Sequence, residues 1–351
     1  SIDIDNLPVG EYEVRAFFNN RFDDEAVASF VIKEYWEKGG DNIAEITLPN
    51  NKGFVYSPVG HGEDLPVVFF AYGGYYSDHE KYHKTLLNFI ASRGYHAVFV
   101  EYENGDFTNA TSAANKFAEA VAAYEDLNLQ GVNKQKIGVV GHSSGGGLAF
   151  KVLKELKDTY QYGSDKSFVM AIDPWFAFEM NQQDLKDLPN NTNTLILQFG
   201  PGGNNMKSLL IDGESRNYST DGKIAGTLFK YLNELYPENV DYKIFANVGD
   251  DRGHKYLNDD ITEGNRNNKG NNYERMKDGL KPLGALMDFT FHDNLEAKAI
   301  ALENNQRAEQ HIFPKQNYAF KCTHNEFTDA VGKLLDTDVN YCPEDIPRSD
   351  N

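Results

Sequence analysis

The stretch that most constrains the fold is residues 136–150, which contain the pattern G-x-S-x-G. It opens with an apolar run at 137–140, typical of a strand buried on both faces, and continues as the glycine-rich start of a helix. A serine in so tight a strand-to-helix turn carries its hydroxyl above the sheet, and the flanking glycines let neighbouring chain pass close by. We therefore predict that Ser143 is a nucleophile. The alternative is a glycine-rich turn that contains a serine by chance.

The backbone N–H of the next residue, Ser144, should lie at the N-terminus of that helix. Unpaired amides and the helix dipole favour negative charge there, so this amide is one expected donor of an oxyanion hole. A second donor belongs in the loop after the third strand of such a sheet, where this chain has a Tyr-Gly-Gly-Tyr turn. We assign it to the backbone N–H of Tyr75, with Tyr76 and His142 beside the substrate. A plain glycine turn is the alternative here.

From residue 43 the chain alternates between strands and helices. The expected strands are residues 43–48, 53–56, 65–71, 96–101, 137–140, 168–172, 194–199 and 240–245, of which the first two form an antiparallel pair. The expected helices are residues 79–93, 114–127, a segment running from 144 towards 156, 225–235, 273–289 and 293–308. Such alternation predicts an α/β fold, a three-layer sandwich around a mostly parallel central sheet.

Three regions are expected along the chain. Residues 1–36 contain two alternating segments around a polar turn, which predicts a β-hairpin, and this hairpin resembles the closing strands of an immunoglobulin-like module. Residues 37–260 form the α/β core. Residues 261–351 form a C-terminal extension, which begins with an Asn-rich loop that could border the site as a cap.

The acid and the base should follow the nucleophile in the order Ser, Asp, His, on loops beyond the carboxyl ends of the strands. We choose His254, just past the last strand, as the base. The long loop at 200–223 holds several acids, of which Asp221 is our choice, since it abuts the following helix, and Asp212 is second. At another strand exit, Trp175 would form an apolar wall for an acyl or aromatic group.

The formal net charge is −19, because 53 acidic residues outnumber 34 basic ones. This balance argues against nucleic acid as a partner and favours a neutral substrate. No apolar run is long enough to span a membrane, and no H-E-x-x-H or C-x-x-C pattern indicates a metal or other cofactor. The two cysteines, Cys322 and Cys342, bracket a terminal segment, so we expect a disulfide and a secreted, monomeric protein.

The nucleophile turn also resembles a known family. The run Gly-His-Ser-Ser-Gly-Gly at 141–146 is similar to the G-H-S-x-G-G turn of α/β-hydrolases, in particular cutinase-like polyester hydrolases and dienelactone-hydrolase-related esterases. The turns at 74–75 and 174–175 resemble their oxyanion and substrate-clamping residues, and the segment around Asp221 is similar to their catalytic-acid turn. The resemblance spans about residues 43–258, and the long loop at 201–218 departs from it.

These observations predict a serine carboxylic ester hydrolase that acts through a Ser143, His254 and Asp221 triad and an acyl-enzyme. The resemblance implies neutral esters as substrates, including polyesters such as PET or cutin-like polymers. A peptidase or an acyltransferase would use the same triad. From a different class, the chain could be an inactive, hydrolase-like binding or adhesion module of a larger secreted protein.

Overall fold

The structure is a computed structural model of the 351-residue chain. It describes residues 10–17, 25–32, 35–60, 63–73, 77–102, 110–174, 182–199, 208–211, 214–217, 238–245, 257–259 and 276–302, and the single residues 180, 228, 232, 233, 235, 236 and 273. Everything below concerns these residues.

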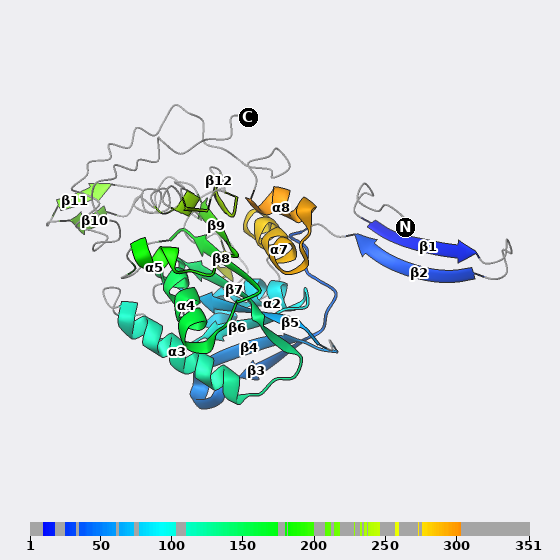
Figure 1. Cartoon of the computed structure of the whole chain (residues 1–351), viewed down its shortest axis with the longest axis horizontal. Coiled ribbons are helices and arrows are strands. Elements are labelled where there is room, and N and C mark those ends of the chain that lie inside the picture. Colours follow the sequence, from blue (N-terminus) through cyan, green and yellow to red (C-terminus); the bar gives the residue numbers. More distant parts are fainter. Residues whose placement is uncertain are drawn as a thin grey trace, which may run out of the picture.

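Eight strands form the central sheet (Figure 1). They are β3 (Ile43–Thr47), β4 (Gly53–Pro58), β5 (Leu65–Ala71), β6 (His96–Val100), β7 (Val132–His142), β8 (Lys166–Ile172), β9 (Thr192–Phe199) and β12 (Val240–Phe245). Their order in the sheet is β12-β9-β8-β7-β5-β6-β4-β3. The six strands from β12 to β6 are parallel, whereas β4 and β3 pair antiparallel. The predicted α/β class with a mostly parallel sheet is confirmed.

Helices cover both faces of this sheet. They are α1 (His79–Tyr82), α2 (Lys84–Ala91), α3 (Ala110–Asp126), α4 (Ser144–Tyr160), α5 (Gln182–Lys186), α7 (Lys277–His292) and α8 (Leu295–Leu302), with a short 3₁₀ turn at Pro49–Asn51. Successive side chains of a strand point to opposite faces, and Phe69 and Phe70 show which helices lie on which side. The Phe69 ring contacts Phe117 of α3, while the Phe70 ring contacts His83, at the start of α2. The fold is thus a three-layer sandwich.

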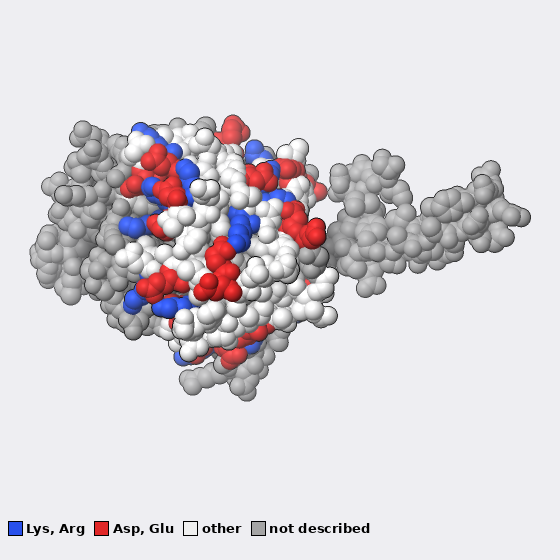
Figure 2. Space-filling view, turned by 60° about the horizontal axis from the view of Figure 1, so that its bottom comes forward, with Lys and Arg blue, Asp and Glu red and all other residues white. Residues whose placement is uncertain are grey.

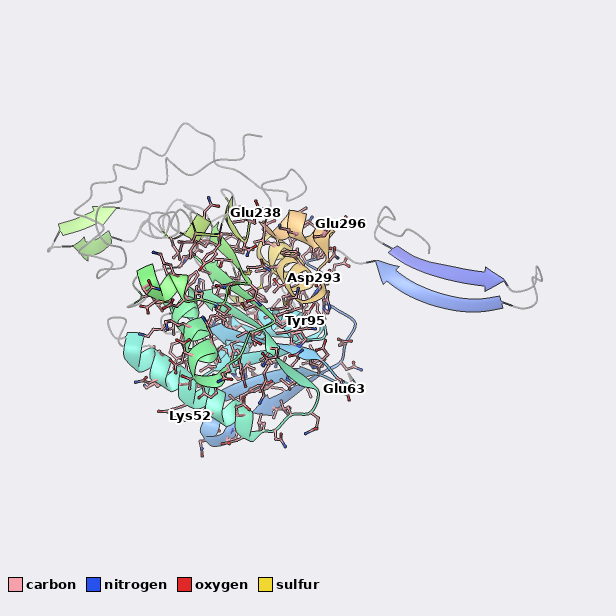
Figure 3. The ribbon with its side chains drawn as sticks, viewed as in Figure 1. Lys52, Glu63, Tyr95, Glu238, Asp293 and Glu296 are labelled. Carbon is pink, nitrogen blue, oxygen red and sulfur yellow. The ribbon has the colours of Figure 1, made fainter. Side chains whose placement is uncertain are left out.

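The layer that contains α2 is completed by α7, which comes from the C-terminal extension. Phe291 of α7 packs on Phe168 of β8 with ring centroids 5.5 Å apart, and on Tyr95 with centroids 5.4 Å apart. The neighbouring His292 Nε2 lies 3.1 Å from the Tyr95 hydroxyl (Figure 3 labels Tyr95). The described part of the extension therefore packs on the sheet as one of its covering helices.

Two further strand pairs lie outside the central sheet. The strands β1 (Gly10–Phe17) and β2 (Glu25–Ile32) form the antiparallel hairpin expected near the N-terminus. The strands β10 (Ser208–Ile211) and β11 (Glu214–Asn217) form a second antiparallel pair, in a stretch for which we expected only a loop. The sequence between them is Asp-Gly, which is a favoured two-residue hairpin turn. This dipeptide is therefore a sequence signal for the β10–β11 hairpin.

The helix predicted at 79–93 is instead two helices. The backbone leaves the helical region at His83, with φ −130° and ψ 2°, so α1 ends there and α2 begins. The Asp78 side chain caps α1 by accepting a hydrogen bond from the Lys81 N–H at 2.9 Å. The short helix α5 was not predicted, and α3 begins four residues earlier than expected.

The face of the molecule in Figure 2 carries acidic and basic side chains close together, separated by uncharged surface. Among the described residues, oppositely charged side chains form ion pairs, for example Lys154 with Asp158 within α4. On this face the acidic side chains of the described residues are therefore not gathered into one patch. Among the described residues, no helix combines the length and hydropathy needed to cross a bilayer.

Candidate active site

Ser143 stands at the turn between β7 and α4 with a strained backbone. Its φ is +58° and its ψ is −124°, a region that residues with a side chain rarely adopt. Both neighbours, His142 and Ser144, are 2% exposed, whereas Ser143 itself is partly exposed. The strained turn therefore leaves Ser143 partly exposed between two buried neighbours, on the tight strand-to-helix turn that the sequence indicated.

Hydrogen bonds and close contacts fix this conformation. The Ser143 N–H donates to the Ile172 carbonyl of β8 at 2.9 Å, and the Gly146 N–H donates to the Ser143 carbonyl at 2.9 Å. A Cβ at Gly141 would lie 2.1 Å from the Gly145 carbonyl oxygen, and one at Gly145 would lie 2.2 Å from the Ala71 carbonyl oxygen. Real Cβ atoms do not approach so closely, so both positions require glycine.

The chain leaving β5 passes directly against Ser143. A Cβ added at Gly73 would lie 2.3 Å from the Ser143 Cβ, 3.0 Å from its Oγ and 2.5 Å from the His142 carbonyl oxygen. The exit of β5 is the position at which the fold requires the second oxyanion donor. The described backbone therefore reaches the side of Ser143 two residues before Tyr75.

The electrostatics at the N-terminus of α4 favour a developing negative charge. The helix has 17 residues with no acidic side chain in its first turn, and its first residue is Ser144. Ser143 occupies the N-cap position but its side chain makes no capping hydrogen bond, so capping does not occupy the hydroxyl. At the exit of β6, burial and then the nearby Asp78 carboxylate raise the pKa of Glu101. A further negative charge next to the Glu101 carboxylate would therefore be unfavourable.

A buried carboxylate lies just past β8, the strand next to β7. Asp173 follows β8 directly, has φ +41° and is 1% exposed. Its N–H donates to the Leu197 carbonyl at 2.7 Å, and its Oδ1 accepts the Phe199 N–H at 2.8 Å. Asp173 therefore joins the carboxyl ends of β8 and β9. In this stretch only Trp175 is predicted as a site residue from the sequence, although an acid at a strand exit is a signal that also points to Asp173.

A second buried carboxylate anchors the segment that follows the predicted base. Asp259 is 5% exposed and accepts two hydrogen bonds from Thr85, from the backbone N–H at 2.8 Å and from Oγ1 at 2.5 Å. Thr85 lies in the first turn of α2, where backbone N–H groups lack helical partners. Leu257 is also buried and would contact a Cβ at Gly279 of α7 at 2.6 Å. The chain is thus fixed three residues after His254.

Several predicted site residues fall outside the described residues, so the structure does not place them: Tyr75, Tyr76, Trp175, Asp212, Asp221, His254, Cys322 and Cys342. The residues that the structure does bring together are Ser143, His142, Ser144 and the exits of β5 and β8. The roles assigned to all of them remain predictions. Within the described ranges, no group of three or more His, Cys, Asp or Glu side chains is arranged to hold a metal ion.

Comparison with known proteins gives one family. Residues 36–195 match the chlorophyllase family model, and chlorophyllases are serine esterases. The matched segment is less than half of the chain. It contains Ser143 and Asp173 and ends before Asp221 and His254. No curated protein showed a significant match to the chain.

Proposed function

The chain has the α/β-hydrolase fold, and on that premise we propose that it is a serine carboxylic ester hydrolase. The observation that carries the proposal is the strained turn at Ser143, which exposes a hydroxyl at the N-terminus of α4 and against the exit of β5. The chlorophyllase match over residues 36–195 supports the same class of reaction.

The proposed reaction begins when Ser143 Oγ attacks the carbonyl carbon of the ester and its proton passes to His254. The Ser144 and Tyr75 amides stabilise the negative oxygen of the tetrahedral intermediate. The bond between carbon and the alcohol oxygen then breaks, and the alcohol leaves with the proton from His254. Water then attacks the carbonyl carbon of the acyl-enzyme and gives its proton to His254. The bond between that carbon and Ser143 Oγ breaks, which releases the acid, and the proton from His254 restores the Ser143 hydroxyl.

The acid that orients His254 is proposed from chain order. Asp221 is the first choice and Asp212 the second, as the sequence indicated. Asp173 joins them as a third candidate, because it is a buried carboxylate at the carboxyl edge of the sheet, beside the nucleophile strand. Replacing each of the three by Ala and comparing kcat ranks them. Replacing the triad acid should lower kcat the most. If Asp212→Ala lowers kcat more than Asp221→Ala does, the role of triad acid passes to Asp212.

The proposed substrates are neutral esters. The net charge of −19 repels anions at long range. Polyesters, PET and cutin-like polymers among them, remain proposals from the resemblance, and the name of the matched family adds chlorophyll to the esters worth testing. A chain-length series of p-nitrophenyl esters, a polyester film and chlorophyll would separate these substrates. Amides and alcohol acceptors in the same assay would identify a peptidase or an acyltransferase.

The decisive experiment is Ser143→Ala assayed on short p-nitrophenyl esters. We expect kcat to fall by at least about a thousandfold. Ser164→Ala is the control, since Ser164 is an exposed serine on the loop before β8. Undiminished hydrolysis by Ser143→Ala would end the proposal.

The alternative is an inactive binding or adhesion module of a secreted protein. A fluorophosphonate probe distinguishes the two, because it reacts with an activated serine and not with an inactive fold. We expect labelling of the parental chain and none of Ser143→Ala. A parental chain that is folded but neither labelled nor hydrolytic would favour the binding module.

A further inference from the structure

Two tyrosines at neighbouring strand exits bind each other's backbone. Tyr72 follows β5 and Tyr102 follows β6, and these strands are parallel neighbours. The Tyr72 hydroxyl donates to the Tyr102 carbonyl, and the Tyr102 hydroxyl donates to the Tyr72 carbonyl. The two rings are stacked with centroids 4.4 Å apart, and the residues are only 1% and 3% exposed. This reciprocal pair holds the ends of β5 and β6 together.

The two hydrogen bonds differ in what they hold. The carbonyl that accepts from Tyr102 is that of Tyr72, and it precedes Gly73, whose backbone lies against Ser143. On its other side this carbonyl faces the first turn of α4, because a Cβ at Gly145 would lie 2.5 Å from its oxygen. The bond from Tyr102 therefore acts on the peptide between β5 and the side of the nucleophile. The bond from Tyr72 acts on the exit of β6 instead.

The chemistry of Tyr102 suits a permanent donor. Burial raises the pKa of its hydroxyl well above the ordinary value, and the neighbouring Tyr72 raises it further. A raised pKa favours the protonated hydroxyl, which is the form that donates a hydrogen bond. Losing a strong donor to a buried carbonyl is costly, so removing the Tyr102 hydroxyl should let the peptide after Tyr72 shift.

We propose that Tyr102 is a positioning residue for the loop that leaves β5, acting through the Tyr72 carbonyl on Gly73, whose backbone lies against Ser143. This proposal rests on the proposed function, because it assumes that the Tyr75 amide stabilises the oxyanion. Oxyanion donors act only when they are already aimed at the position that the charged oxygen will occupy. A small displacement of this loop should slow the chemical step and leave substrate binding intact.

The test compares Tyr102→Phe with two matched variants. Tyr72→Phe removes the other half of the same pair and leaves the Tyr72 carbonyl its donor. Tyr124→Phe removes a buried hydroxyl that has no hydrogen-bond partner among the described residues. For Tyr102→Phe we expect kcat on a p-nitrophenyl ester to fall about ten- to a hundredfold, with KM changed by less than about twofold. For the other two variants we expect kcat within about threefold of the parental value.

A second measurement is independent of the substrate. Hydrogen exchange followed by mass spectrometry reports on the amides of residues 73–77, and these should exchange faster in Tyr102→Phe than in Tyr72→Phe. Affinity for a trifluoromethyl ketone, which mimics the tetrahedral intermediate, should fall in proportion to kcat. Equal losses in the two tyrosine variants, or unchanged exchange at 73–77, would overturn the proposal. If the parental chain hydrolyses no ester, the proposed function fails, while the exchange comparison still decides whether Tyr102 holds this loop.

Discussion

His96 makes a sharp prediction about stability at acid pH. It is the first residue of β6 and is 2% exposed, and its ring lies edge-on to Tyr124 with centroids 6.4 Å apart. Neither ring nitrogen has a hydrogen-bond partner among the described residues. Burial alone lowers the pKa of His96 from 6.5 to about 4. The folded protein therefore holds a neutral imidazole where the unfolded chain would already be protonated.

The sign and size of the effect follow from linkage. Above pH 6.5 neither state binds the proton, so His96 costs nothing. As the pH falls from 6.5 towards about 4, the unfolded chain gains the proton and the folded chain does not, so the free energy of unfolding decreases. The full difference in pKa corresponds to about 3.4 kcal/mol. Between pH 7.5 and pH 4.5 the loss due to His96 is about 2.5 kcal/mol.

Replacing His96 with Phe removes the titrating group and keeps an aromatic ring against Tyr124. Urea unfolding at pH 7.5, 6.0 and 4.5 gives the free energy of unfolding of each chain, and the quantity of interest is its change with pH. We expect that change to be smaller in His96→Phe by about 2.5 kcal/mol, whatever the absolute stability of the variant. Parallel losses in the two chains, within about 0.5 kcal/mol, would show that His96 is protonated in the fold and refute the reasoning.

Two further predictions follow from particular contacts, and a third comes from the sequence. Gly73→Ala places a Cβ 2.3 Å from that of Ser143, so ester hydrolysis should fall by more than about tenfold, as measured with p-nitrophenyl esters against the parental chain. Asp259→Ala removes the distant cap of α2 and should lower the free energy of unfolding by about 1–2 kcal/mol. Asp259→Asn should lower this free energy less, and equal losses of the two variants in urea unfolding would contradict capping. If Cys322 and Cys342 form a disulfide, thiol titration of the unreduced, unfolded protein should find no free thiol, and reductant should lower the thermal midpoint.

The strands could be predicted from sequence because burial on both faces leaves a plain signal. The bounds of β5 at Leu65 and Ala71 match the prediction, since seven consecutive residues are all buried. The expected single helix at 79–93 was wrong for a reason outside that stretch. The first turn of α2, at Thr85, is capped by Asp259, which lies 174 residues away in the sequence. The sequence of residues 79–93 alone contains no information about a partner so far away in the chain.

The residues of the candidate site also fall into those that the local sequence predicts and those that depend on distant partners. The turn at Ser143 is encoded in adjacent residues, because the glycines at 141 and 145 are needed within the turn itself. The carboxylate of Asp173 and the tyrosine pair of Tyr72 and Tyr102 become apparent only when separate strands end at the same edge. Each of them binds backbone groups, and a backbone N–H or carbonyl has no signature in the sequence.

This division also says which substitutions the site can tolerate. A side chain that binds a backbone group can be replaced by any residue that presents the same donor or acceptor, so the residue type at Tyr102 is constrained less than its hydrogen bond. A glycine required by a contact of about 2 Å has no substitute, because every other residue adds the same Cβ. The turn at Ser143 should therefore tolerate no exchange at Gly141 or Gly145. By contrast, a residue other than tyrosine that donates a hydrogen bond to the Tyr72 carbonyl should recover the activity that Tyr102→Phe loses.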